Sequence, residues 1–177
     1  MWGNVLIVLA GLFSLIVIAG FFLPSKVSFS RTLSLDADKK KVFEFINDLK
    51  KWRQWTAWSK ENDARIALTY EGKEKGVGAV KRWKGKKMGA GRMEIIKSEP
   101  YKNVVVEIIF ISGMRFESNF QLVSEETVTH VTWNMHGRVR RFGIAKIIGL
   151  LLPGWMGKDM QTGLKILKMI SENKEPH

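Results

Sequence analysis

The chain has 177 residues, 45% hydrophobic and 26% charged; this length and mix fit one folded domain and exclude a disordered or collagen-like protein. Lysine and arginine outnumber aspartate and glutamate by 29 to 17, and the net charge of +12 predicts an anionic neighbour such as lipid head groups, nucleic acid or an acidic partner. The chain has no cysteine, which excludes disulfides, thiolate metal sites and cysteine nucleophiles.

Residues 1–25 differ sharply from the remainder because they contain no charged side chain. The apolar run from Trp2 to Leu23 is long enough, as a helix, to cross a hydrocarbon core of about 30 Å, and Pro24 ends it. A cleaved signal peptide fits less well, because no Lys or Arg precedes the run and no A-x-A pattern follows it. The sequence therefore predicts a single transmembrane anchor over 1–25, followed by one domain over 26–177.

The flanking charges predict how this anchor is oriented. No Lys or Arg precedes the apolar run, whereas Lys26, Arg31, Lys39, Lys40 and Lys41 follow it closely. The positive-inside rule then places the C-terminal domain in the cytoplasm. An uncleaved export signal, with the domain on the other side, is the alternative.

Residues 26–177 read as an α+β domain. Residues 27–35 alternate apolar and polar side chains, as a half-buried strand does, and Asp36 or Asp38 can cap the helix that carries Val42, Phe43 and Ile46. Six further strands follow between 64 and 137, separated by short turns typical of an antiparallel meander. Residues 138–155 are expected to be irregular or partly helical, with Gly143 and Gly149 allowing a lid, and residues 156–170 form a closing helix.

This order, β-α-α-β6-α, and several local segments resemble the helix-grip fold of the SRPBCC/START-like superfamily, and in particular its polyketide cyclase/dehydrase group with membrane-anchored bacterial members. The matching segments are Trp52-x-x-Trp55-x-x-Trp58, 76–79, 83–85, 89–95 and 132–137. The resemblance covers about residues 26–172 and implies a curved antiparallel sheet wrapped around a long C-terminal helix. Members of this superfamily bind lipids, sterols, hormones or polyketides, and only some are enzymes.

Bulky apolar residues share the inward parity of the predicted strands, and with one residue of the closing helix they are candidate walls of a ligand pocket. A lining of methionine and aromatic side chains suits an apolar, adaptable ligand, although the same residues could simply fill a core. The predicted pocket residues are Trp83, Met93, Ile95, Val106, Ile108, Phe110, Phe116, Phe120, Trp133, Met135 and Leu164.

Basic residues concentrate in two segments. Residues 73–92 hold eight Lys or Arg and one acid, and residues 127–158 add more cations without an acid. These basic segments could form an ordinary solvated surface or could dock onto anionic lipid. Binding of nucleic acid is disfavoured, because no RNA- or DNA-binding motif is present. The predicted membrane-surface residues are Lys81, Arg82, Lys84, Lys86, Lys87, Arg138, Arg140 and Arg141.

The three tryptophans Trp52, Trp55 and Trp58 lie at a spacing of three. They predict either a hydrophobic plug beneath the sheet or an amphipathic segment on the bilayer.

Catalytic groupings are scarce. His130 and His136 share a polar strand face without clustered carboxylates, so we expect no metal site and no cofactor. No G-x-S-x-G elbow and no phosphate-binding loop occur.

The sequence favours a membrane-anchored domain that sequesters, transports or presents a hydrophobic small molecule or lipid. A cyclase, dehydratase or hydrolase using the same cavity is one alternative, and would need a buried ionisable group. A non-catalytic protein with a filled core and a basic face for an unidentified protein partner is the other.

Overall fold

The computed structural model describes residues 2–22, 24–56, 63–139 and 144–174. Its elements are, in chain order, α1 (Trp2–Phe22), β1 (Lys26–Leu35), α2 (Lys39–Ile46), the 3-10 helix η1 (Lys51–Gln54), β2 (Ala67–Gly72), β3 (Ala79–Lys84), β4 (Ala90–Glu99), β5 (Asn103–Phe110), β6 (Arg115–Glu125), β7 (Val128–Arg138) and α3 (Ile144–Ser171). The six strands expected between residues 64 and 137 are present as β2 to β7.

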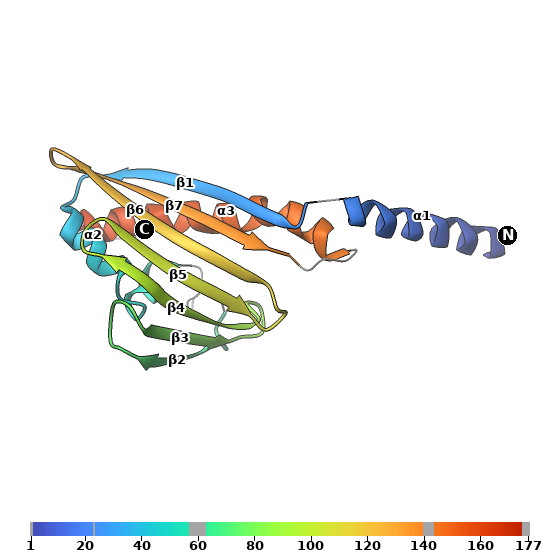
Figure 1. The fold of residues 1–177 in the computed structure, drawn as a ribbon, viewed down its shortest axis with the longest axis horizontal. Coiled ribbons are helices and arrows are strands. Elements are labelled where there is room, and N and C mark those ends of the chain that lie inside the picture. The colour runs from blue at the N-terminus through green and yellow to red at the C-terminus, as the bar shows by residue number, and fades with distance from the viewer. Residues whose placement is uncertain (1, 23, 57–62, 140–143, 175–177) are drawn as a thin grey trace.

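The seven strands form one antiparallel sheet in the order β1-β7-β6-β5-β4-β3-β2. Figure 1 shows the sheet curving around one side of α3, with α2 near the C-terminal end of that helix. A register shift between Ile95 and Lys97 marks a β-bulge in β4, a feature that bends a strand and increases its twist. The curved antiparallel sheet with its C-terminal helix is the helix-grip arrangement that the sequence predicted.

Alternation of apolar and polar residues decides which face of each strand is buried. In β6, Phe116, Ser118, Phe120 and Leu122 are buried, and the residues between them are exposed or half-buried. The same period of two in β7 buries Val131, Trp133 and Met135 against α3.

The short helix α2 begins where its cap directs. Asp38 accepts a hydrogen bond from the backbone N–H of Lys40 at 2.6 Å, as an N-cap residue does. Val42, Phe43 and Ile46 then share one helical face and are buried in the core.

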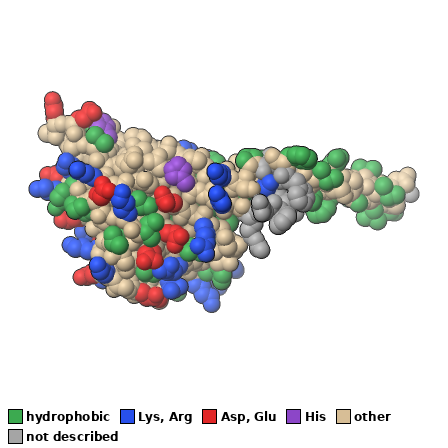
Figure 2. Space-filling view, in the orientation of Figure 1, with side chains coloured by type: hydrophobic (Ala, Val, Ile, Leu, Met, Phe, Trp, Pro, Cys, Tyr) green, Lys and Arg blue, Asp and Glu red, His purple; other side chains and the backbone are tan. Residues whose placement is uncertain are grey.

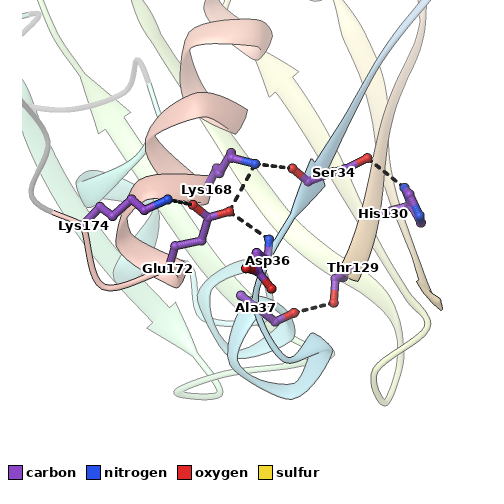
Figure 3. A network of polar contacts seen from close by, with 8 residues as sticks. All are labelled: Ser34, Asp36, Ala37, Thr129, His130, Lys168, Glu172 and Lys174. Carbon is purple, nitrogen blue, oxygen red and sulfur yellow. Dashed lines mark hydrogen bonds and ion pairs between the residues drawn. The ribbon is translucent and has the colours of Figure 1, made fainter. Parts of the chain in front are cut away.

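The C-terminal end of α3 is tied to the start of the fold by a polar network (Figure 3). The side chain of Glu172, only 4% exposed, accepts hydrogen bonds from the backbone N–H of Asp36 at 2.8 Å and from Lys174 Nζ at 2.7 Å. Lys168 lies 3.1 Å from the same carboxylate and donates to the Ser34 carbonyl at 2.7 Å. These contacts fix α3 along β1 and hence set the space between helix and sheet.

The structure differs from the sequence prediction in two places, and the first is the segment 138–155. Helix α3 begins at Ile144, so most of residues 138–155, which the sequence predicts to be irregular or partly helical with a lid, are helical, with Pro153 inside the helix. Gly149 is buried, and a Cβ added to it would lie 2.9 Å from a methyl group of Val139, so this glycine permits close packing rather than a hinge. Gly143 lies outside the described residues.

The second difference concerns residues 1–25, for which the sequence predicts a transmembrane anchor. They do form a helix, α1, which extends away from the domain in Figure 1. Within the described parts of the chain, however, no helix is both long enough and apolar enough to cross a membrane, so the predicted transmembrane span is not supported.

Candidate functional site

A cavity of about 210 Å³ lies between α3 and the concave face of the sheet. Strands β5, β6 and β7 supply one wall and α3 the other, and the β3–β4 and β5–β6 turns close one end. Its lining residues are Lys87, Met88, Phe110, Met114, Phe116, Trp133, Met135, Leu152, Met156, Asp159 and Met160.

Methionine dominates this lining: five of the eight methionines of the chain line the cavity. Unbranched thioether side chains adapt to different shapes and make favourable contacts with aromatic rings, which Phe110, Phe116 and Trp133 provide. The walls are therefore suited to an apolar molecule whose shape need not be closely specified.

Two charged residues, Lys87 and Asp159, also line the cavity, and both are exposed, so they lie at its rim. Desolvation raises the pKa of Asp159 above its ordinary value. Lys87 comes from the β3–β4 turn and Asp159 from α3, so the rim presents a cation and a carboxyl group that can orient a polar end of a ligand.

The β3–β4 turn is held in place by Asp63. Its carboxylate accepts hydrogen bonds from the backbone N–H groups of Lys87 at 2.7 Å and Met88 at 3.2 Å. Desolvation raises the pKa of this carboxyl, but the backbone hydrogen bonds outweigh it and the pKa is lowered. Asp63 thus fixes two residues of the cavity wall.

A second cavity, of about 300 Å³, shares Lys87, Met88 and Asp159 with the first and continues along α3 toward η1. Its remaining wall comes from η1, the residues after it and α3. The two spaces therefore meet at the same rim.

Trp52 and Trp55 form a hydrophobic plug rather than a surface for the bilayer. Both are buried, with ring centroids 5.3 Å apart, and Trp55 lies 5.7 Å from Trp133. Trp58 lies outside the described residues.

The eleven predicted pocket residues divide into two groups. Phe110, Phe116, Trp133 and Met135 line the cavity. The other seven are buried in the packed core without reaching this cavity: Trp83, Met93, Ile95, Val106, Ile108, Phe120 and Leu164.

The predicted pocket took only Leu164 from the closing helix, and it missed the residues of α3 and of the turns that do line this cavity. Leu152, Met156 and Met160 follow each other at helical spacing, a signal that was available in the sequence. Met88 and Met114 lie in turns, where nothing local indicates that they point back toward the sheet.

Most of the predicted membrane-surface residues are exposed, namely Arg82, Lys84, Lys86, Lys87 and Arg138. The prediction of a surface position is wrong for Lys81. Its side chain is fully buried, because it shares the inward parity of Trp83 on β3. Burial lowers the pKa of Lys81 to about 8. Arg140 and Arg141 lie outside the described residues.

The two described histidines pair with serines across β1 and β7. His130 lies 2.9 Å from the hydroxyl of Ser34, and His136 lies 2.9 Å from that of Ser28. Among the residues with described positions, no group of three or more histidine, aspartate or glutamate side chains could hold a metal ion.

Comparison with solved structures identifies the same fold. Protein CV1439 from Chromobacterium violaceum superposes with a TM-score of 0.59 at 14% identity, over 84% of this chain and 99% of that one. The Aha1 dimer from Colwellia psychrerythraea gives 0.57 at 18%, over 85% and 99%. The di-domain ARO/CYC StfQ from the steffimycin biosynthetic pathway gives 0.64 at 10%, over 84% of this chain and 51% of StfQ. No protein of curated function matches the chain in sequence.

Sequence identities this low are evidence for the fold alone. The sequence itself, however, also matches a family model. The model is described as "Polyketide cyclase / dehydrase and lipid transport" and covers residues 26–172, from the first residue of β1 to just beyond the end of α3. With the strand order, the cavity between α3 and the sheet, and this match in agreement, the chain belongs to the polyketide cyclase/dehydrase and lipid transport family.

Proposed function

We propose that the protein binds a hydrophobic small molecule or lipid chain in the cavity between α3 and the sheet. The single observation that carries this proposal is the methionine-rich and aromatic lining of a partly open cavity of about 210 Å³, with charge only at its rim. Apolar cavities of roughly 150 Å³ stay dry and hold a benzene-sized molecule, so this one suits a single ring or a short acyl segment. A longer ligand would extend past Lys87 and Asp159 into the neighbouring cavity.

Methyl NMR of the full chain, labelled with ¹³C at the methionine methyl groups, tests this proposal. Titration with monocyclic aromatic compounds and medium-chain fatty acids should shift the methyl signals of Met88, Met114, Met135, Met156 and Met160. Met169, which does not line the cavity, serves as the internal reference. Uniform small shifts of all methionines would count against a defined site.

Two matched variants of α3 sharpen this test. Leu152 lines the cavity and is 8% exposed, whereas Leu150 is 53% exposed. Leu152→Phe should fill part of the space and weaken binding at least about tenfold, the cost of roughly 1.4 kcal/mol of steric conflict. Leu150→Phe should leave the affinity unchanged.

Asp159 favours a second candidate function, acid–base catalysis at the rim. A carboxyl group with a raised pKa beside a ligand cavity is a candidate proton donor or acceptor, and two of the solved structures with this fold, StfQ and BexL, are described as ARO/CYC proteins. Catalysis predicts that Asp159→Asn abolishes turnover of a bound polyketide while the methionine methyl shifts persist. Simple sequestration predicts no turnover in either protein.

We propose further that α1 attaches the domain to a lipid bilayer, with the domain on the cytoplasmic side. Support comes from the absence of charge in residues 1–25 and from the exposed apolar side chains of α1, including Leu6, Ile7, Leu9 and Phe13. Full-length protein should float with neutral phosphatidylcholine vesicles. Leu9→Asp combined with Phe13→Asp should release it, because each charge costs about 3 kcal/mol in an apolar helix. Asn4→Asp, near the helix end, is the control.

Protease treatment of sealed cells and of inverted membrane vesicles tests the cytoplasmic assignment. The domain should be cleaved only in the inverted vesicles. Cleavage in intact cells would place it on the other side.

A further inference from the structure

We infer that Lys26, Arg115 and Arg138 form a binding site for the phosphate groups of anionic phospholipids at a bilayer surface. The inference rests on the attachment through α1 proposed above, and it concerns the outer face of the sheet rather than the cavity.

The three cations occupy neighbouring positions of one row that crosses three strands. Lys26 on β1 pairs in register with Arg138 on β7, and Arg138 pairs with Arg115 on β6. The Cβ atoms of residues directly opposite one another on antiparallel strands are about 5 Å apart, and like charges on such a pair are destabilising. A row of three adjacent cations therefore costs stability unless an anion offsets the repulsion.

No acid within the described chain relieves this repulsion by an ion pair. Arg82 and Arg92, further along the sheet, are paired with Glu71 and Glu94. In contrast, Lys26, Arg115 and Arg138 are exposed and make no salt bridge to any residue that the structure describes.

The same three residues line an open groove of about 560 Å³ on the outer face. The next row of this groove contains His136, Glu117 and Glu107, which are also in register. The cations thus lie at the end of the groove nearest the first residue of β1, and the two carboxylates lie one row further in. An anion would be held at the cationic end and repelled from the inner row.

The position of this row identifies the bilayer as the source of the phosphate. Lys26 follows the uncharged residues 1–25 directly, so the row lies at the end of the sheet from which α1 departs. Figure 2 shows Lys and Arg side chains close to that junction. The β5–β6 turn, at the same end of the sheet, presents Ile111, which is 85% exposed. Apolar tips flanked by cations are typical of surfaces that contact lipid head groups.

A fluorescent label gives a local readout of this contact. The chain has no cysteine, so Ile111→Cys can be labelled uniquely with an environment-sensitive dye in the full-length protein. Val123→Cys, which is also exposed but near the other end of β6, is the matched control. With vesicles of phosphatidylcholine and phosphatidylglycerol, the label at position 111 should shift to the blue and the label at 123 should not. Neutral phosphatidylcholine vesicles should shift neither.

Two triple variants with equal loss of charge isolate the row. Lys26→Gln, Arg115→Gln and Arg138→Gln together should abolish the shift and lower the affinity for anionic vesicles roughly 100-fold, since each basic residue near an anionic leaflet contributes roughly fivefold. The control is Lys73→Gln, Lys75→Gln and Lys102→Gln, three exposed lysines in turns at the far end of the sheet. That control should retain the shift. Raising the salt from about 0.1 M to about 1 M should remove the shift in the wild type, because the Debye length falls from about 10 Å to about 3 Å.

Several results would overturn the inference and separate it from the proposal about α1. A label at 111 that responds equally to neutral and anionic vesicles, or that keeps its shift in the first triple variant, removes the phosphate site while leaving attachment through α1 intact. Protein that floats with neither kind of vesicle removes both. A response to single-stranded RNA but not to anionic vesicles would assign the row to nucleic acid instead.

Discussion

Trp133 on β7 donates its indole N–H to the hydroxyl of Ser118 on β6 at 2.6 Å, and both side chains are buried. The bond holds the indole ring against Phe120, with ring centroids 4.7 Å apart, and makes its other side part of the cavity wall. A small polar residue in the middle of an apolar strand face therefore has a defined purpose: it positions the largest side chain of the cavity.

Replacing Ser118 with Ala should lower the free energy of unfolding by about 1–3 kcal/mol, because the buried indole N–H loses its acceptor. Urea unfolding followed by tryptophan fluorescence measures the change. Ser124→Ala, on an exposed position of the same strand, is the control and should change stability little. Equal stability of Ser118→Ala and wild type would show that the indole finds another acceptor.

Two glycines of α3 should respond in opposite directions to alanine. A Cβ on Gly163 would lie 2.9 Å from the carbonyl oxygen of Trp55, so Gly163→Ala should push α3 from the tryptophan plug and cost about 1–3 kcal/mol. A Cβ on Gly154 would meet no atom within 4 Å, so Gly154→Ala should gain up to about 1 kcal/mol from helix propensity. Thermal unfolding of the two variants compares them directly. Destabilisation by both would indicate that the helix itself is strained near Pro153.

Glycine and proline residues near the start of α3 explain why the sequence predicts residues 138–155 as irregular or only partly helical. Gly143, Gly149, Pro153 and Gly154 lower the local helix propensity, and on local grounds an irregular segment is the better reading. Contacts that are distant in sequence reverse this preference, since Gly149 packs against Val139. Such contacts cannot be read from the neighbouring residues.

Strand parity predicted the buried faces well and the cavity only in part. The alternation of apolar and polar residues shows which side of β5, β6 and β7 faces inward, and this alternation identified Phe116 and Trp133. It does not state where α3 stands away from the sheet, which depends on sheet curvature and on turns such as the one carrying Met88. The same parity would have placed Lys81 inside with Trp83, had its charge not argued for the surface.

Glu172 should make the stability of the fold depend on pH at the acidic end. Hydrogen bonds from Lys174, from the backbone N–H of Asp36 and from Lys168 lower its pKa from 4.5 to about 2, although desolvation raises it. The folded protein thus binds fewer protons than the unfolded chain at this group between pH 4.5 and 2. The stabilisation is present in full above pH 4.5 and is lost as the pH falls toward 2.

Glu172→Gln should therefore lower the free energy of unfolding by about 1 kcal/mol at pH 7, a modest value because its lysine partners are exposed to solvent. The difference from wild type should shrink between pH 4.5 and 2. Urea unfolding over this range measures it, with the exposed Glu126→Gln as control. A difference that stays constant across the range would assign the effect to packing rather than to the charge.

Lys81 should affect stability in the alkaline range, where its charged form destabilises the fold, whereas the charged form of Glu172 stabilises it. Burial lowers its pKa from 10.5 to about 8, so the folded protein holds fewer protons than the unfolded chain between these values, and stability rises with pH across that window. Below pH 8 the side chain is charged inside the core, and the net cost of this charge is largest there. Lys81→Met replaces the amine with an uncharged side chain of similar length. This variant should be more stable than wild type at pH 7 by up to about 3 kcal/mol. This advantage should decrease from pH 8 to 10.5, whereas Lys84→Met, an exposed control on the same strand, should show no such pH dependence.

Urea unfolding of the three proteins between pH 7 and 10.5 measures these differences in stability. A Lys81→Met variant that is less stable than wild type at every pH would show that the amine stabilises the core by more than its desolvation costs.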